Sequence, residues 1–302
     1  MHILHLLSYN LILITRLVIR AFLKITLYKP IHLILVQILG ADIIFIFFIV
    51  LIANSFAIHS EELPDWLDPQ VFEKNRESMH TTFTVDRCSD ITLGGIWKFN
   101  FNETAEGRPS DFFVTGYDDS SWDEIPVPGI WELNGYGDPV YTSRNYAWER
   151  NYVNNPPYPP VEHNHVGQYR RSFDIPYSWK GKDVFLHIGS AISNVRVWIN
   201  GKEVGYSEDS KLEARFDITR YVKTGENLIA LEIFRWCDGT YLEDQDFWRL
   251  TGLARDTYVF SREKIRIEDV RVLADASGKA ELYAEVTKGV SSVEFTICDP
   301  QG

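Results

Sequence analysis

Short stretches in which apolar and polar residues alternate follow one another along most of the chain. The clearest span residues 93–101, 167–175, 183–188, 193–199 and 228–236. Alternation with a period of two residues is typical of strands with one buried face, and β-branched and aromatic residues favour such strands. No long stretch with a helical period lies between residues 81 and 302. The pattern therefore predicts an all-β protein.

Turn residues refine this prediction. Asn200 and Gly201 separate two of the strands, and both residue types accept the positive φ of a tight type I′ hairpin. Pro126 and Pro128 exclude residues 121–131 from the middle of a sheet, so we expect an edge or a loop there. We expect the polar segment 61–81 to wrap over the sheets without forming a strand. Strands of this length and spacing suit a jelly-roll sandwich.

Residues 1–58 differ from the rest. Residues 43–53 are an unbroken apolar run, about as long as the core of a signal peptide, and small residues before Ala57 suit cleavage there. The interpretation is an N-terminal export signal, which predicts a periplasmic or extracellular protein. The alternative is a membrane anchor, because residues 1–40 are long and apolar for a signal. In either case only this leader meets a membrane.

The charge of the chain limits its partners. The formal net charge is −12, although residues 1–58 carry four basic residues against one acidic residue. The part beyond the leader is therefore strongly acidic and repels phosphate backbones, which argues against nucleic acid as a partner. Cys88, Cys237 and Cys298 are far apart and show no metal-binding spacing, so we interpret them as packing residues.

The segment most indicative of function is 235–252. It carries Asp238, Glu243, Asp244 and Asp246 among four aromatic residues. Flat rings cover the C–H faces of a sugar, and carboxylates accept hydrogen bonds from its hydroxyl groups. Closely spaced carboxylates also suit a hard cation. The alternative is an acidic surface loop whose aromatic residues only pack beneath it.

Asp238-Gly-Thr-Tyr-Leu-Glu-Asp-Gln-Asp-Phe-Trp-Arg-Leu-Thr-Gly252 resembles a long and specific motif of the large bacterial β-galactosidases of glycoside hydrolase family 2. Shorter matches begin near residue 65. The resemblance implies three parts. Residues 1–58 are the hydrophobic leader, and residues 59–262 form a galactose-binding-like jelly-roll sugar-binding domain. Residues 263–302, with expected strands at 265–273, 280–286 and 292–298, open an immunoglobulin-like β-sandwich.

The resemblance also implies site residues. The final aspartate of the motif, Asp246, would bind galactose hydroxyls and ligate Na⁺, with the other sodium ligands supplied only by a full-length enzyme. Ser143 stands where the family has a galactose-binding asparagine, and its side chain is shorter. Asn145 lies two residues on, and in an extended segment it would point to the same side and substitute for that asparagine. The alternative is that Ser143 and Asn145 are only turn residues. The family's Mg²⁺ ligands are not expected in this chain. Arg249 and Arg255 are expected to be structural partners of nearby acids.

The expected activity of the family is retaining hydrolysis of terminal β-D-galactosides by homo-oligomeric enzymes. Such catalysis needs two carboxyl groups about 5–5.5 Å apart, which the family carries on a (β/α)8 barrel of about 250 residues. No segment of the chain has the repeated strand–helix alternation of such a barrel. Glu243 and Asp244 are adjacent, and on a strand they would point to opposite faces. We therefore expect a chain that supplies one wall of the galactose site and is inactive alone. The alternatives are a stand-alone carbohydrate-binding module and a non-functional truncated relic.

Overall fold

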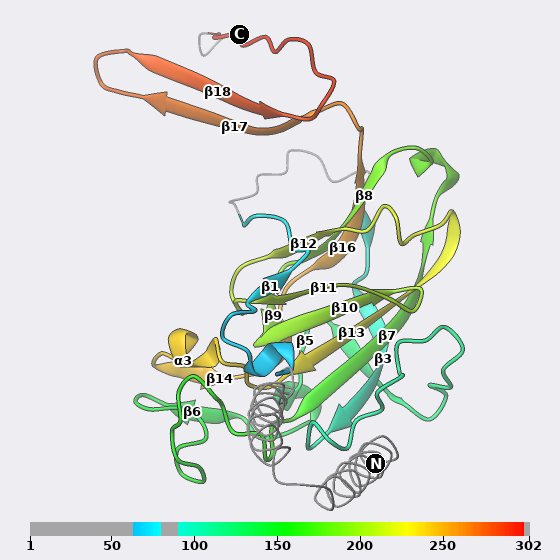
Figure 1. Cartoon of the computed structure of the whole chain (residues 1–302), viewed down its shortest axis with the longest axis vertical. Coiled ribbons are helices and arrows are strands. Elements are labelled where there is room, and N and C mark those ends of the chain that lie inside the picture. Colours follow the sequence, from blue (N-terminus) through cyan, green and yellow to red (C-terminus); the bar gives the residue numbers. More distant parts are fainter. Residues whose placement is uncertain (1–62, 80–89, 299–302) are drawn as a thin grey trace, which may run out of the picture. The chain divides into compact units, whose positions relative to one another are not determined.

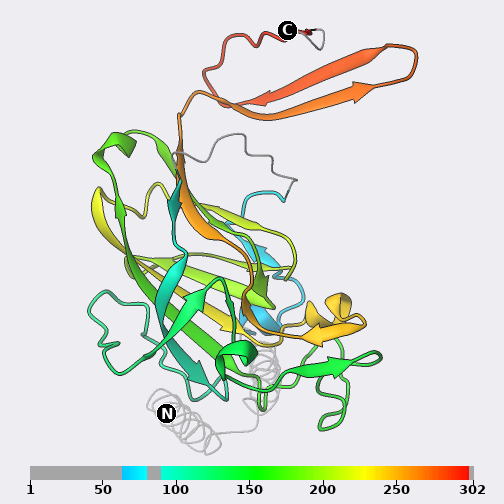
Figure 2. The same cartoon turned by 180° about the vertical axis from the view of Figure 1, so that it is seen from behind.

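The computed structural model describes residues 63–79 and 90–298. The expected leader, residues 1–58, and Cys88 lie outside the described residues. Within the described part, antiparallel strands dominate and helical segments are short (Figures 1 and 2). The predicted all-β class is confirmed. None of the described helices has the length and apolar character needed to cross a membrane.

Two antiparallel sheets form the main body of the described part. The larger has seven strands in the order β1 (Glu73–Lys74), β11 (Lys202–Glu208), β10 (Asn194–Ile199), β13 (Gly225–Phe234), β7 (Val166–Ile175), β3 (Gly95–Asn102) and β4 (Asp123–Val127). The smaller has four strands in the order β12 (Ala214–Asp217), β8 (Asp183–Ile188), β16 (Thr257–Arg262) and β2 (Ile91–Thr92).

Smaller elements complete the chain. Three short strands pair in the order β5 (Gly129–Ile130), β15 (Gly252–Leu253) and β9 (Ala191–Ile192). Two further sheets have two strands each, β14 (Phe247–Arg249) with β6 (Val140–Thr142), and β17 (Ile267–Ala274) with β18 (Ala280–Val286). The helical segments are η1 (Asp65–Leu67), η2 (Glu132–Asn134), η3 (Tyr177–Trp179) and α3 (Thr240–Glu243).

The hydrophobic core lies between the two large sheets. Alternate residues of the strands point into it, and its fully buried members include Trp97, Phe99, Leu186, Phe216, Ile229, Leu231 and Val259. Each such side chain contributes about 1.5–3 kcal/mol relative to an exposed one. Apolar and polar residues therefore alternate in the sequence because every second residue of these strands is buried in the shared core.

Two predicted turn features are confirmed. Asn200 and Gly201 have φ values of 51° and 79°, so both adopt the left-handed conformation that a type I′ hairpin requires between β10 and β11. The proline-containing segment forms β4, which is an edge strand of the large sheet. A strand with a proline is tolerated there because one side of an edge strand needs no hydrogen-bond donor.

The prediction that segment 61–81 lacks a strand was wrong. Glu73 and Lys74 pair with Ser207 and Tyr206 and form the other edge of the large sheet. The neighbouring Gly205 makes this approach possible, because a Cβ there would lie 2.2 Å from the carbonyl oxygen of Lys74. The residue that allows β1 to pair is therefore in its partner strand, β11. The polar sequence of β1 itself does not indicate a strand.

The third strand expected in the C-terminal region is also absent. Residues 265–273 and 280–286 correspond to β17 and β18, whereas residues 292–298 have no strand assignment. Phe295 and Ile297 remain 40% and 79% exposed. A strand needs a partner edge, and apolar alternation alone does not supply one. The expected domain boundaries stay predictions.

Candidate functional site

Asp246 lies at the end of a two-stranded ribbon formed by β6 and β14. The register pairs Thr142 with Phe247 and Tyr141 with Trp248. Ser143 and Asp246 are the next residues of the two chain segments beyond the last pair of this register, and both lie in bends. The hydroxyl group of Tyr141 donates a hydrogen bond of 2.6 Å to Oδ1 of Asp246 and holds this carboxylate at the ribbon end. The hydrogen bond to the carboxylate also raises the pKa of Tyr141.

The two faces of the ribbon differ because successive residues of a strand point to opposite sides. Asp246 and Trp248 are exposed, and Tyr141 lies opposite Trp248 on the same face. The rings of Tyr141 and Trp248 have their centroids 5.6 Å apart. Phe247 and Arg249 point the other way, into the protein. The solvent-facing side therefore combines one carboxylate with two aromatic rings.

The structure separates this face from the other acids and rings of segment 235–252. Trp236 is buried against Trp148, with ring centroids 5.1 Å apart, and Tyr241 and Phe247 are half-buried. Only Trp248 among the four rings is exposed. The carboxylates divide in the same way, since Asp246 is exposed and the other three have buried partners. Three of the four rings pack into the protein, as the surface-loop alternative expected, but three of the four carboxylates have buried partners, which that alternative did not expect.

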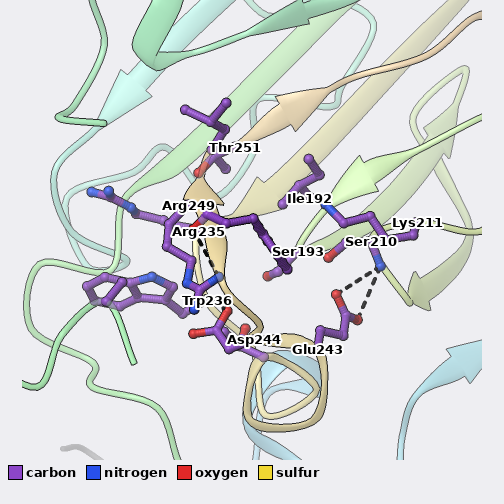
Figure 3. Close-up of a pocket in the computed structure, with 14 residues that line it drawn as sticks. Ile192, Ser193, Ser210, Lys211, Arg235, Trp236, Glu243, Asp244, Arg249 and Thr251 are labelled. Carbon is purple, nitrogen blue, oxygen red and sulfur yellow. Dashed lines mark hydrogen bonds and ion pairs between the residues drawn. The ribbon is translucent and has the colours of Figure 1, made fainter. Parts of the chain in front are cut away.

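The inner face of the ribbon borders a small cavity of about 40 Å³ (Figure 3). Nε of Arg249 lies 3.3 Å from Oδ1 of Asp244, and both side chains are 8% exposed. The carboxylate of Glu243 accepts the backbone N–H of Ser210 at 3.2 Å. The ion pair between Arg249 and Asp244 confirms that Arg249 is a structural partner of a nearby acid. Arg255 does not fit its prediction, because it donates to the carbonyl oxygen of Lys211.

The strand argument about Glu243 and Asp244 was wrong. Glu243 ends helix α3 and Asp244 follows as its C-terminal cap, so both side chains border the same cavity. Burial raises the pKa of Glu243 and raises that of Asp244 to about 6. Each carboxylate already has a partner, however, and a cavity of this size holds waters but no sugar ring. The pair has no place for a glycosidic bond.

Asn145 does not take the place expected for it. Residues 143–145 form a bend, and Asn145 has a φ of 70°, in the left-handed region. The chain reverses there, so the assumption of an extended segment was wrong. The hydroxyl group of Thr142 donates to the carbonyl oxygen of Arg144 and tightens this bend. Ser143 and Asn145 are both exposed at this bend.

A second acidic group was missed in the sequence. The carboxyl groups of Glu208 on β11 and Asp238 lie close enough to affect each other's pKa, and Tyr206 donates to Oε1 of Glu208 at 2.7 Å. Glu208 is 5% exposed, and its burial raises its pKa to about 8. Burial is also the main cause of the raised pKa of Asp238. Thirty residues separate the two acids, so no local spacing indicates the pair.

The described residues do not form a sodium site by themselves. Within residues 63–79 and 90–298, no group of three His, Cys, Asp or Glu side chains is arranged to hold a metal ion. Asp246 offers one carboxylate, and one of its oxygens already accepts a bond from Tyr141. A hard cation takes several oxygen ligands, so Asp246 alone does not fit a resident ion.

Sequence comparison assigns the family. Residues 91–262, which include segment 235–252 and every strand of the two large sheets except β1, match the model of the glycosyl hydrolases family 2, sugar binding domain. The chain belongs to this family. This match confirms the predicted sugar-binding sandwich.

Two curated relatives agree with the match. The chain is 41% identical to a beta-galactosidase of Priestia megaterium over 232 residues, which cover 72% of this chain and 22% of that protein. It is 38% identical to a beta-galactosidase of Halalkalibacterium halodurans over 222 residues, or 70% and 22% of the two chains. A solved beta-glucuronidase of an uncultured Clostridium sp. is 23% identical, with a TM-score of 0.49 over 68% of this chain and 35% of that one. The chain spans about a fifth of the length of the two curated beta-galactosidases.

Proposed function

We propose that this chain is the N-terminal portion of a β-galactosidase that hydrolyses terminal β-D-galactosides with retention. In this proposal the chain supplies one wall of the galactose site. Family membership and two beta-galactosidase relatives at 38–41% identity support it. The exposed carboxylate of Asp246, fixed beside two aromatic rings, is the observation that carries it.

Asp246 binds galactose hydroxyls in this proposal. Oδ1 is oriented by the Tyr141 hydroxyl, and the carboxylate lies exposed at the ribbon end. A carboxylate is a strong acceptor, and a hydrogen bond to a charged group contributes about 1.5–3 kcal/mol net. Ser143, the residue after β6, offers a hydroxyl to the same ligand in this proposal. Asn145 has no part in this proposal, because the bend turns it away.

The catalytic carboxyl groups belong, in this proposal, to residues outside the described part. The buried acids described above are engaged with Ser210, Arg249 and one another, and the cavity beside Glu243 and Asp244 is too small for a sugar. A sodium ion at Asp246 is proposed only for a longer protein that supplies further oxygen ligands. The chain alone is expected to release no product from a chromogenic β-galactoside.

A chimera tests the role of Asp246. Residues 63–298 replace the corresponding part of the Priestia megaterium relative, and kcat/KM is measured with a chromogenic β-galactoside. We expect Asp246→Asn to lower kcat/KM about 10- to 150-fold, the equivalent of one lost charge-assisted hydrogen bond. The Tm is expected to stay unchanged, because Asp246 is exposed.

The matched control is Asp174→Asn, which neutralises an exposed carboxylate on β7. It is expected to leave kcat/KM and Tm as they are. If Asp246→Asn behaves like this control, Asp246 is only an acid at the protein surface and the proposed galactose site is wrong.

A further inference from the structure

The outer face of the β6–β14 ribbon has an unusual composition for a solvent-facing surface. Trp248 is 55% exposed and Tyr141 is 52% exposed, although burial of large aromatic side chains usually stabilises the folded protein. Within the described residues the indole N–H of Trp248 has no acceptor. The two rings adjoin Asp246, so an apolar surface and a fixed carboxylate lie on the same side of the ribbon.

The ribbon is held firmly from behind. Phe247 packs under the amino group of Lys211, which lies 4.9 Å from the ring centroid. Arg249 stacks on the same ring at 4.6 Å and pairs with the buried Asp244. These contacts fix β14 without using the outer face. The aromatic pair is therefore presented in one orientation before any ligand binds, which lowers the entropy that binding costs.

The chemistry of a galactopyranosyl ring fits this face. Its axial hydroxyl group points to one side and leaves neighbouring C–H bonds together on the other, which forms a continuous apolar surface. In glucose the corresponding hydroxyl is equatorial, so the C–H bond at that carbon points to the opposite face and the continuous apolar surface is lost. An aromatic ring attracts the C–H surface, while the hydroxyl groups at the edge of the sugar reach a carboxylate beside the ring.

We propose that Trp248 and Tyr141 form a stacking platform that selects galactosides over glucosides, with Asp246 binding hydroxyl groups at its edge. This inference rests on the proposed function, and it adds the residues that choose the sugar. Trp248 supplies the larger apolar surface. Tyr141 supports it across the ribbon and orients Asp246 through the 2.6 Å hydrogen bond.

Nuclear magnetic resonance on the isotope-labelled chain tests the platform. The chain has nine tryptophans, and the signal that disappears in Trp248→Phe assigns the indole N–H of Trp248. Methyl β-D-galactoside is expected to shift that signal, with millimolar or weaker affinity because only one wall of the site is present. Saturation of aromatic protons is expected to reach the C–H face of the galactoside more than that of methyl β-D-glucoside.

Variants distinguish the contribution of the aromatic rings to sugar binding from that of the Asp246 carboxylate. Trp248→Ala is expected to weaken galactoside binding about two- to tenfold and to abolish the preference over glucoside, whereas Trp248→Phe keeps part of both. Tyr177→Ala removes an exposed ring on η3 and serves as the control, with no effect expected. The other eight indole signals report whether each variant remains folded.

Each outcome decides between the two proposals. If Asp246→Asn loses binding while Trp248→Ala keeps both affinity and preference, the platform is wrong and the proposed function stands. If Trp248→Ala loses binding while Asp246→Asn keeps it, the platform stands and the carboxylate contact is wrong. A Trp248 signal that neither sugar moves at high concentration overturns the platform, because the face then serves a contact other than a sugar.

Discussion

At the scale of single residues, burial explains which of the many acids can bind a ligand. Asp246 is exposed and accepts a hydrogen bond from Tyr141, so its charge is available to a sugar. Asp244 and Glu208 are carboxyl groups of the same kind, but burial raises their pKa values to about 6 and about 8. These two acids therefore affect the stability of the fold, and that effect depends on pH.

Glu208 gives a testable pH dependence. With a raised pKa in the folded state, the native protein binds more protons than the unfolded chain between about pH 4.5 and pH 8. The free energy of unfolding should therefore fall as pH rises through this window. One pKa unit corresponds to about 1.4 kcal/mol, so a shift of this size would lower the free energy of unfolding by up to about 5 kcal/mol across the window.

Glu208→Gln keeps the shape of the side chain and cannot ionise. Urea unfolding at about pH 5 and about pH 8 should show a flatter dependence for this variant than for the original chain. Asp238, whose pKa is also raised, leaves part of the slope in place. Parallel pH dependences for the two proteins would mean that Glu208 is charged in the fold and the interpretation of the pair is wrong.

At the scale of elements, the sequence predicts strands that bury a face and fails where a strand depends on its partner. β3, β7, β8, β10 and β13 follow the period-two pattern because their inner residues enter one core. β1 was missed because its pairing with β11 is set by the close approach at Gly205. Residues 292–298 have the pattern but no strand, since no edge receives them.

The same reasoning explains the site. Asp246 and Ser143 could be proposed because motifs of the resembled family carry them, and their roles stay predictions. The register of β6 and β14 pairs the residues that adjoin them, Thr142 with Phe247. The partnership of Tyr141 with Trp248 was missed, because over a hundred residues separate them and only the register brings them together. Asn145 was misplaced because an extended segment was assumed, although asparagine is among the residues that accept the positive φ found there.

The β17–β18 hairpin should be the first described element to be cleaved by a protease. Its two strands pair only with each other, and both faces expose large apolar residues, among them Val270, Val272, Leu273 and Tyr283. An isolated two-stranded hairpin is marginally stable in water, so it opens often enough for cleavage. Limited digestion with chymotrypsin should cut after Leu273 or Tyr283 before it cuts at the buried Trp97 or Tyr169.

Mass spectrometry of the early fragments measures the order of cleavage. A fragment that retains the two large sheets and loses the hairpin is the expected first product. Simultaneous cleavage at core and hairpin positions would show that the hairpin is as stable as the sandwich. It would also show that exposure of its apolar residues does not weaken it.

At the scale of the whole molecule, the chain combines an acidic sugar-binding sandwich with an apolar N-terminal region. The sandwich belongs to a family of glycosyl hydrolases, and its candidate site lies on an exposed ribbon. Residues 1–58 lie outside the described part, so their role rests on the sequence. The apolar run at 43–53 and the small residues before Ala57 predict an export signal.

A reporter fused after Ser60 tests this prediction. We expect the fusion to leave the cytoplasm and to be cleaved near Ala57, because an apolar segment of this length engages the export machinery and is too short to span a bilayer comfortably. The control replaces Ile46 and Phe48 with charged residues, which interrupts the apolar run and should keep the reporter inside. A reporter that stays soluble in the cytoplasm without these changes contradicts the export signal. Uncleaved reporter in the membrane fraction would instead establish the anchor, and the sugar-binding sandwich would then act at a membrane surface.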